Sequence, residues 1–296
     1  MFGYFELMRP KNCLMAAFAV LIGSFLVLKL DLLEVWNPVV IALAAAFLIT
    51  GGGNGINDYF DVEADEMNRP DRPIPSGRVS RRKALAFSLG FFILGIAFAA
   101  FTNLLAFGIA IFNSLLLIVY SWSLQHKTFF GNFTVAYLTG STFLFGGAAV
   151  GNTQLPLLFG LLAGLTIFAR EIVKDIEDIE GDKSLFLKKQ SLVKKHVLER
   201  FVVTKDGVVL KYRERTGLVT AAVSLALAIT LSPAPYLLGF VGLNYLIFVI
   251  PADVAFALSM TKANRAKEKE DFSRLSRLIK YGYFLGLLAF IGGILV

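Results

Sequence analysis

The sequence predicts an all-α membrane protein that crosses the bilayer several times, and three observations support this fold class. The 296 residues are 56% hydrophobic and only 17% charged, with a mean hydropathy of +0.67. Soluble domains are about 45–50% apolar and about 25% charged, so this chain has too little polar surface to cover a globule. Its apolar residues form runs close to the roughly 20 residues that span a membrane. The charged residues gather between these runs.

Nine apolar runs are expected to form the transmembrane helices. They cover approximately residues 12–29, 38–60, 83–101, 103–122, 133–151, 155–178, 217–232, 235–258 and 278–296. Tight turns alternate with longer charged connections at 61–82, 123–132, 179–216 and 259–277. Apart from Lys29, every lysine and arginine lies in the N-terminal segment, in these longer connections or in the adjoining helical turns. Because positively charged loops stay inside, the sequence predicts a multi-pass protein of the cell membrane with a cytoplasmic N-terminus and an outer C-terminus.

The whole chain, 1–296, is expected to form one membrane-embedded domain. Its longest cytoplasmic connection contains an insertion at 184–216, in which Asp206-Gly207 separates two β-prone stretches. An Asp-Gly pair in that position is typical of a β-hairpin. The insertion is interpreted either as a solvated loop or as a lid or headgroup-binding surface.

Several other classes of site are excluded by composition. One cysteine, Cys13, rules out an internal disulfide, and two distant histidines, His126 and His196, make no zinc pattern. The formal net charge of +7 comes from residues scattered between apolar runs. A nucleic-acid-binding protein needs a basic face with stacking aromatics, so no nucleic-acid partner is expected.

The first acidic motif ends the second apolar run, at residues 57–65 (NDYFDVEAD). On a continuous helix at 100° per residue, four of its polar side chains share one face within about 100° of arc. These four are Asn57, Asp58, Asp61 and Asp65. Glu63 points to the opposite side of the helix.

The second acidic motif ends the sixth run, at residues 175–182 (DIEDIEGD). Asp175, Asp178 and Asp182 lie within about 60° of one another on a helix, and Glu177 and Glu180 diverge from that stripe. Both runs cross the membrane from outside to inside, so both motifs are expected on the cytoplasmic side.

Carboxylates at the membrane surface in this arrangement predict a cation site. Converging carboxylates repel one another unless cations bridge them. Hard oxygen ligands suit Mg²⁺, which is commonly completed by substrate phosphates. The predicted metal ligands are Asp58, Asp61, Asp65, Asp175, Asp178 and Asp182.

Cationic and amide side chains near these motifs are candidates for binding the phosphates. Arg69 and Arg72 lie in a stiff loop with three prolines, and arginine makes forked contacts to phosphate. The other candidate substrate-binding residues are Asn12, Asn54, Asn57, Lys127, Arg170 and Lys174. Tyr120, at the inner end of the fourth run, is expected to line the reacting carbon.

These motifs resemble those of the intramembrane prenyltransferases of the UbiA superfamily. The likeness rests on the two aspartate motifs, on the loop at 68–73 (NRPDRP) and on Tyr120-Ser121, and it extends over most of the chain. It implies a helical bundle around a central cavity with a cytoplasmic cap, which binds Mg²⁺ and an isoprenyl diphosphate. Residues 55–61, 68–77 and 170–175 are most similar to archaeal digeranylgeranylglyceryl phosphate synthases, whereas the insertion at 184–216 departs from them.

The resemblance implies transfer of a geranylgeranyl group from its diphosphate to geranylgeranylglyceryl phosphate, for ether-lipid synthesis. Cations would stabilise the leaving diphosphate, and Asp175 or Asp182 would accept the proton from the acceptor. One alternative is prenyl transfer to an aromatic acceptor, as in quinone or haem biosynthesis. Another is a cation or lipid transporter, although a transporter is expected to carry its acids near the middle of its spans.

Overall fold

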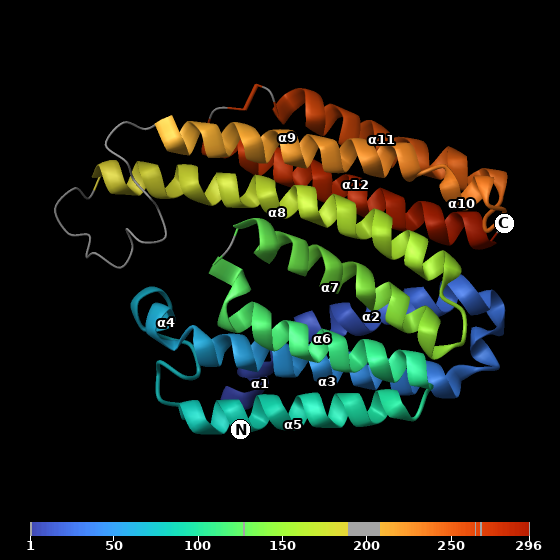
Figure 1. The fold of residues 1–296 in the computed structure, drawn as a ribbon, viewed down its shortest axis with the longest axis horizontal. Helices are drawn as coiled ribbons and strands as arrows, with labels where there is room; N and C mark the ends of the chain where they lie inside the picture. Colours follow the sequence, from blue (N-terminus) through green and yellow to red (C-terminus); the bar gives the residue numbers. More distant parts are fainter. Residues whose placement is uncertain (1, 127, 189–207, 264, 267, 296) are drawn as a thin grey trace. The chain divides into compact units, whose positions relative to one another are not determined.

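The computed structural model describes residues 2–126, 128–188, 208–263, 265–266 and 268–295 (Figure 1). These residues contain helices and connections, with no β-strand among them, which confirms the all-α class. The α-helices are α1 (Phe2–Met8), α2 (Pro10–Leu28), α3 (Trp36–Phe60), α4 (Val62–Asn68), α5 (Arg81–Ala100), α6 (Leu104–Trp122), α7 (Thr128–Ala149), α8 (Gln154–Lys188), α9 (Val208–Leu231), α10 (Ala234–Leu237), α11 (Leu243–Ala263) and α12 (Lys269–Leu295). Two 3₁₀ turns, η1 (Lys29–Leu33) and η2 (Leu124–His126), complete the described elements.

Eight of the described helices are long and apolar enough to cross a membrane. Helix α7, the fifth expected span, is long enough at 22 residues but is less apolar because it carries serine, threonine and asparagine side chains. Several of these hydroxyls are satisfied within the helix: Thr134 Oγ1 donates to Phe130 O at 2.7 Å, and Thr139 Oγ1 donates to Val135 O at 2.9 Å. This internal pairing lets a polar helix lie among apolar ones.

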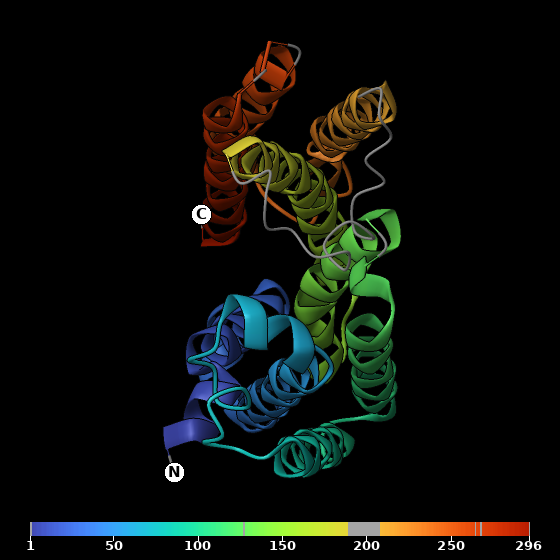
Figure 2. The same cartoon turned by 90° about the vertical axis from the view of Figure 1, so that its left-hand side faces the viewer.

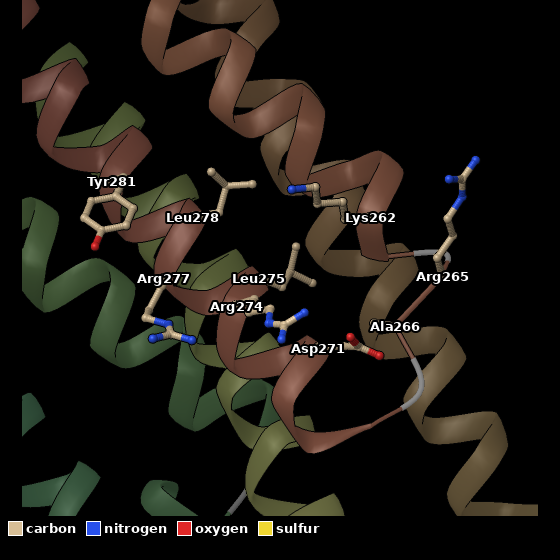
Figure 3. Close-up of a pocket in the computed structure, with 9 residues that line it drawn as sticks. All are labelled: Lys262, Arg265, Ala266, Asp271, Arg274, Leu275, Arg277, Leu278 and Tyr281. Carbon is tan, nitrogen blue, oxygen red and sulfur yellow. The ribbon is translucent and has the colours of Figure 1, made fainter.

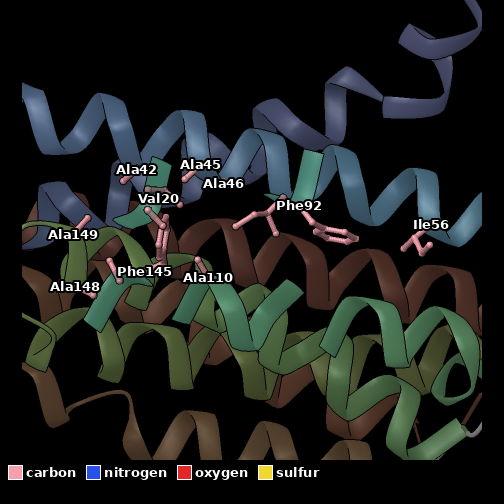
Figure 4. Packing of buried hydrophobic residues seen from close by; sticks show 13 residues of the cluster. Val20, Ala42, Ala45, Ala46, Ile56, Phe92, Ala110, Phe145, Ala148 and Ala149 are labelled. Atoms are coloured by element: carbon pink, nitrogen blue, oxygen red, sulfur yellow. The ribbon is translucent and has the colours of Figure 1, made fainter. Parts of the chain in front are cut away.

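The chain divides into two compact units, Met1–Leu161 and Leu162–Val296. In the first unit, α3 packs against α2, α5, α6 and α7. Its core is built largely of alanines from several helices, together with Val20, Phe92 and Phe145 (Figure 4). Small side chains bring the helices close: a Cβ on Gly55 of α3 would lie 2.4 Å from Ser88 Oγ of α5.

In the second unit, α8 continues beside α9, α11 and α12, as Figures 1 and 2 both show. Ile172 and Ile176 of α8 belong to one buried cluster with Leu225 of α9, Phe256 of α11 and Phe272 of α12. The last turn of α11 and the first turns of α12 therefore lie at the same end of this unit as Ile176 of α8.

Three expected boundaries differ from the structure. The eighth span starts at Leu243 rather than near 235, because Pro235 lies in the short helix α10 and Gly239 turns the chain with a φ of 74°. Helix α12 begins at Lys269, well before the apolar run, because its charged first turns continue the same helix. The second strand of the expected hairpin, 208–210, lies in α9: no helix breaker separates it from the following span. The rest of the expected hairpin, 201–207, lies outside the described residues.

Candidate active site

The first acidic motif lies where α3 ends and α4 begins. Asp58, in the last turn of α3, is buried and forms ion pairs with two arginines, Arg9 and Arg72. Arg72 Nη1 lies 3.1 Å from Asp58 Oδ1 and 2.5 Å from Asp65 Oδ2, so one guanidinium nitrogen bridges two carboxylates. Only 4% of the Asp58 side chain and 9% of the Asp65 side chain are exposed. Both acids thus depend on arginines for their charge compensation.

The helix is interrupted at Asp61, but its hydrogen-bond ladder continues. Asp61 N donates to Asn57 O at 2.9 Å, and Asp65 N donates to Asp61 O at 2.8 Å. The i to i−4 spacing is therefore preserved, and Asp58 and Asp65 still reach a common partner, as the motif spacing predicts. Glu63 is exposed, in agreement with its predicted position off that face.

Asp61 belongs to a separate group of amides. Asn57 Nδ2 donates to Asp61 Oδ2 at 2.5 Å, and Gln125 Nε2 donates to Asp61 Oδ1 at 2.6 Å. Asn57 also donates to Gln125 Oε1 at 3.4 Å. Both carboxylate oxygens of Asp61 are thus held by amides, and the connection after α6 is tied to the end of α3.

The N-terminal segment closes the same end of this unit. Arg9 adopts a left-handed conformation, with a φ of 52°, between α1 and Pro10 at the start of α2. This turn brings its side chain to Asp58 and exposes Met8 O, which accepts a hydrogen bond from Asn54 Nδ2 at 2.8 Å. Asn54 therefore supports the turn that carries Arg9, although the sequence suggested it as a residue that contacts substrate.

The proline-rich loop after α4 is held by a hydrogen bond within the loop and by an ion pair with α1. Val79 N donates to Pro73 O at 2.9 Å, and Arg78 Nη1 donates to Glu6 Oε2 at 2.5 Å. The hydrogen bond to Glu6 raises the pKa of Arg78 further above its ordinary value, so this arginine stays charged. Arg72 is held within this loop, which aims its guanidinium at the aspartates.

Two residues of this site were not among the sequence candidates, Arg9 and Gln125. An arginine directly before Pro10, at the start of an apolar run, is a signal that helps to find Arg9, because proline favours the first helical turn. Gln125 carries no comparable signal, since its contact with Asp61 joins residues 64 positions apart.

The donor set of the first motif fits a divalent cation in one respect. Asp58 and Asp65 already direct one oxygen each at a single cationic atom, Arg72 Nη1. Within the described residues, however, no three acidic, histidine or cysteine side chains are grouped closely enough to hold a metal. Asp61 is turned toward amides instead of joining the other two, so a complete metal site would require it to exchange these partners.

The second motif lies on α8, in the other unit. Ile172, Val173 and Ile176 are buried in the helix packing, while Lys174 and Asp178 are exposed and Asp175 is half-buried. Asp178 therefore lies on the exposed side of α8, and Glu177, which was predicted to diverge from the stripe, is half-buried like Asp175.

Arg170 lies one turn before this stripe. Its Nη1 is 2.6 Å from Glu171 Oε1, and its buried Nε has no hydrogen-bond partner. A buried guanidinium nitrogen without an acceptor is costly, which is consistent with a ligand that supplies one.

The remaining sequence candidates are placed as follows. Asn12 is exposed on α2, where its N donates to Arg9 O at 2.9 Å. Arg69 is exposed at the C-terminal end of α4, where its N donates to Asp65 O at 2.7 Å. Tyr120 is half-buried near the end of α6. Lys127 lies outside the described residues, and so does the side chain of Asp182, whose backbone belongs to α8.

Comparison with known proteins identifies the family to which this sequence is similar. The model of the UbiA prenyltransferase family matches residues 16–288. A digeranylgeranylglyceryl phosphate synthase from Methanopyrus kandleri is 43% identical over 295 residues, which cover 99% of each chain.

Two solved structures have a fold similar to that of this chain. A structure of a digeranylgeranylglyceryl phosphate synthase is 36% identical and superposes with a TM-score of 0.82, over 99% of this chain and 98% of that one. A UbiA homologue from Archaeoglobus fulgidus, bound to GPP and Mg²⁺, shares the fold at 16% identity, with a TM-score of 0.63 over 97% of this chain and 99% of that one. The match extends across both compact units and both aspartate motifs, and the chain is a multi-pass membrane enzyme that belongs to the UbiA prenyltransferase family.

Proposed function

We propose that this prenyltransferase transfers a geranylgeranyl group from geranylgeranyl diphosphate to geranylgeranylglyceryl phosphate, in the synthesis of archaeal ether lipids. The observation that carries this proposal is the full-length likeness to digeranylgeranylglyceryl phosphate synthases, at 43% identity to one of them. The motifs account for the donor better than for the acceptor, because arginines and carboxylates at a membrane surface suit a diphosphate with its metal.

The arginines of the first motif bind the diphosphate in this proposal. Asp58 and Asp65 hold Arg9 and Arg72 at the site, so their donors are already close to the place where an anion binds. Arg69, Lys127, Arg170 and Lys174 add further donors, and Asn57 and Gln125 orient Asp61. Preorganised donors stabilise the negative charge that develops on the leaving group as the allylic C–O bond breaks.

Each aspartate motif supplies ligands to Mg²⁺, the ion found with GPP in the Archaeoglobus fulgidus homologue. The proposed ligands are Asp58, Asp61, Asp65, Asp175, Asp178 and Asp182. When bound, the metal supplies positive charge that makes diphosphate a better leaving group. Asp175 or Asp182 accepts the proton of the attacking hydroxyl, and Tyr120 shields the reacting carbon from water.

The reaction takes place at the cytoplasmic face in this proposal. In the first unit, the N-terminal segment, the loop after α4 and the connection after α6 meet at one end through the contacts of Asp58 and Asp61. These segments are rich in lysine and arginine, as cytoplasmic connections are.

An acceptor assay tests the proposed substrate. Purified enzyme in vesicles would receive radiolabelled geranylgeranyl diphosphate with either geranylgeranylglyceryl phosphate or 4-hydroxybenzoate. The expected product forms only with the glycerophosphate lipid; product only with the aromatic acid would identify a different acceptor class. Ion or lipid flux in liposomes without diphosphate release would instead indicate a transporter.

Aspartate variants test the site itself. Asp61→Ala and Asp178→Ala are each expected to abolish Mg²⁺-dependent diphosphate release without unfolding the protein. The matched controls are Glu63→Ala and Glu177→Ala, which remove a neighbouring acid that diverges from the predicted stripe and should change the rate little. Full activity in either aspartate variant would refute its role as a metal ligand.

A further inference from the structure

A basic pocket lies in the second unit, between the end of α11 and the first turns of α12 (Figure 3). Its volume is about 500 Å³. The charged residues that line it are four cations and one acid: Lys262, Arg265, Asp271, Arg274 and Arg277. The proposed prenyl-transfer chemistry uses none of them.

The shape of the pocket follows from helical spacing. Asp271, Arg274, Leu275 and Leu278 recur at three- and four-residue intervals, so they share the face of α12 that is turned toward α11. Lys262 points from the last turn of α11 toward this face, whereas Arg265 points away from it (Figure 3). Lys262 and Arg274 therefore lie over an apolar floor, and Arg277 lines the edge of the pocket from another side of α12.

The floor connects the pocket to the helix packing of this unit. Leu275 lines the pocket and is also buried, only 3% exposed, in the cluster that contains Ile176 of α8. The pocket is thus built on well-packed helices. Asp271 is engaged with the turn before α12, where its Oδ2 lies 3.3 Å from Glu268 N.

The position of the pocket along α12 corresponds to the level of the lipid headgroups in a membrane. Helix α12 has 27 residues and so is roughly 40 Å long, which exceeds the roughly 30 Å of a hydrocarbon core. Its apolar run begins after Lys280, so Arg274 and Arg277 precede that run by one to two helical turns. Tyr281, at the inner limit of the pocket, is the kind of residue that marks a membrane interface.

Ordinary membrane topology explains why cations occur on this side, but it does not explain why four cations and a single acid line one cavity. Cations held together at a membrane surface repel one another and favour an anion between them. The apolar floor suits the glycerol and first methylenes of an amphiphile better than a free ion. From these observations we infer that the pocket binds the phosphate headgroup of an anionic glycerolipid.

The test is lipid binding to the full-length protein in detergent, measured by native mass spectrometry. Dioleoylphosphatidic acid is the anionic probe and dioleoylphosphatidylcholine is the zwitterionic reference. Wild-type protein should prefer the anionic lipid, and Arg274→Gln with Arg277→Gln should weaken that binding about tenfold or more, since charge-assisted hydrogen bonds are lost.

The matched control is the pair Arg82→Gln and Lys83→Gln, which removes two exposed cations at the start of α5, outside this pocket. It should change binding less than about twofold, because only the local charge of the pocket matters. Equal losses in both double variants, or no loss in either, would overturn the inference. If the pocket variant fails to fold, as judged by thermal unfolding, Lys262→Gln takes its place.

Two further measurements distinguish the possible ligands of the pocket. Displacement of the lipid by equimolar inorganic phosphate would show that a free anion is the ligand, and would overturn the lipid assignment. In steady-state transfer assays, a raised KM for the acceptor with an unchanged KM for the prenyl diphosphate identifies the bound lipid as the acceptor. An unchanged KM for both identifies it as a lipid of the surrounding membrane. The binding measurement needs no prenyl transfer, so it stays informative if the proposed function fails.

Discussion

Removal of the Arg72 side chain is a direct test of how the first acidic motif is held together. In the structure Arg72 bridges Asp58 and Asp65, and both carboxylates are almost completely buried. After Arg72→Ala, Asp58 keeps its ion pair with Arg9, but Asp65 loses the partner described for it. A buried carboxylate without a counter-charge is unfavourable, so the variant should be markedly less stable than the wild type.

The expected size of this effect follows from the burial of the three groups. Breaking a buried ion pair by removing one partner costs about 3–5 kcal/mol. Because Arg9 still compensates Asp58, we expect the lower end of that range. For a unit of 161 residues, about 3 kcal/mol corresponds to a fall in Tm of roughly 6–12 °C. Asp65→Asn in the same background should recover part of this loss, since it removes the uncompensated charge.

The assay is thermal unfolding in detergent, followed by circular dichroism, with and without Mg²⁺. The control is Arg78→Ala, which removes an arginine of the same loop whose ion pair with Glu6 is largely exposed; its effect should be much smaller. Mg²⁺ should stabilise Arg72→Ala more than wild type, because Asp65 then lacks its guanidinium and Asp58 keeps only that of Arg9. Equal Tm values for both arginine variants would refute the argument that Arg72 compensates buried charge.

Three further outcomes are expected. Gly146→Ala should destabilise the protein by about 1–3 kcal/mol, because the new Cβ would lie 2.1 Å from a backbone oxygen of α2. Gly108 has open space around it, so Gly108→Ala should be neutral or slightly stabilising in the same unfolding assay. Gln125→Ala should lower kcat about tenfold and raise the Mg²⁺ concentration needed for half-maximal rate, with little change in Tm. An unchanged Mg²⁺ requirement would refute the role of Gln125 in orienting Asp61 as a metal ligand. In a cysteine-free background, Lys269→Cys should react with a membrane-impermeant maleimide only from the cytoplasmic side. Asn152→Cys should react only from the outer side. The reverse pattern would show that the predicted topology is inverted.

The helices and the spacing of the acidic motifs were predictable because they depend on local periodicity. Apolar runs of about 20 residues predict spans wherever polar side chains are few, and α7 marks the limit of that rule. The shared partner of Asp58 and Asp65 follows from the i to i−4 ladder, which the interruption at Asp61 leaves intact.

The partners of these acids were harder to predict because they come from distant parts of the chain. Arg9 and Asp58 are 49 positions apart, and Gln125 and Asp61 are 64 positions apart. Such contacts depend on how α2, α3 and α6 pack, which hydropathy does not encode. The expected hairpin failed for a related reason: the β-prone stretch at 208–210 joins a long helix, and tertiary context outweighs local propensity.

The bridging position of Arg72 has a consequence for how ligands compete and cooperate at this site. Asp58 and Asp65 carry guanidinium counter-ions of the protein itself, so a metal that takes over these carboxylates must displace an arginine. The displaced guanidinium then becomes available to an anion. Conversely, an anion that draws Arg72 away leaves Asp65 without a guanidinium and Asp58 with that of Arg9 alone, so both carboxylates bind a cation more readily. Metal and diphosphate should therefore raise each other's affinity by the same factor, whichever binds first, as thermodynamic linkage requires.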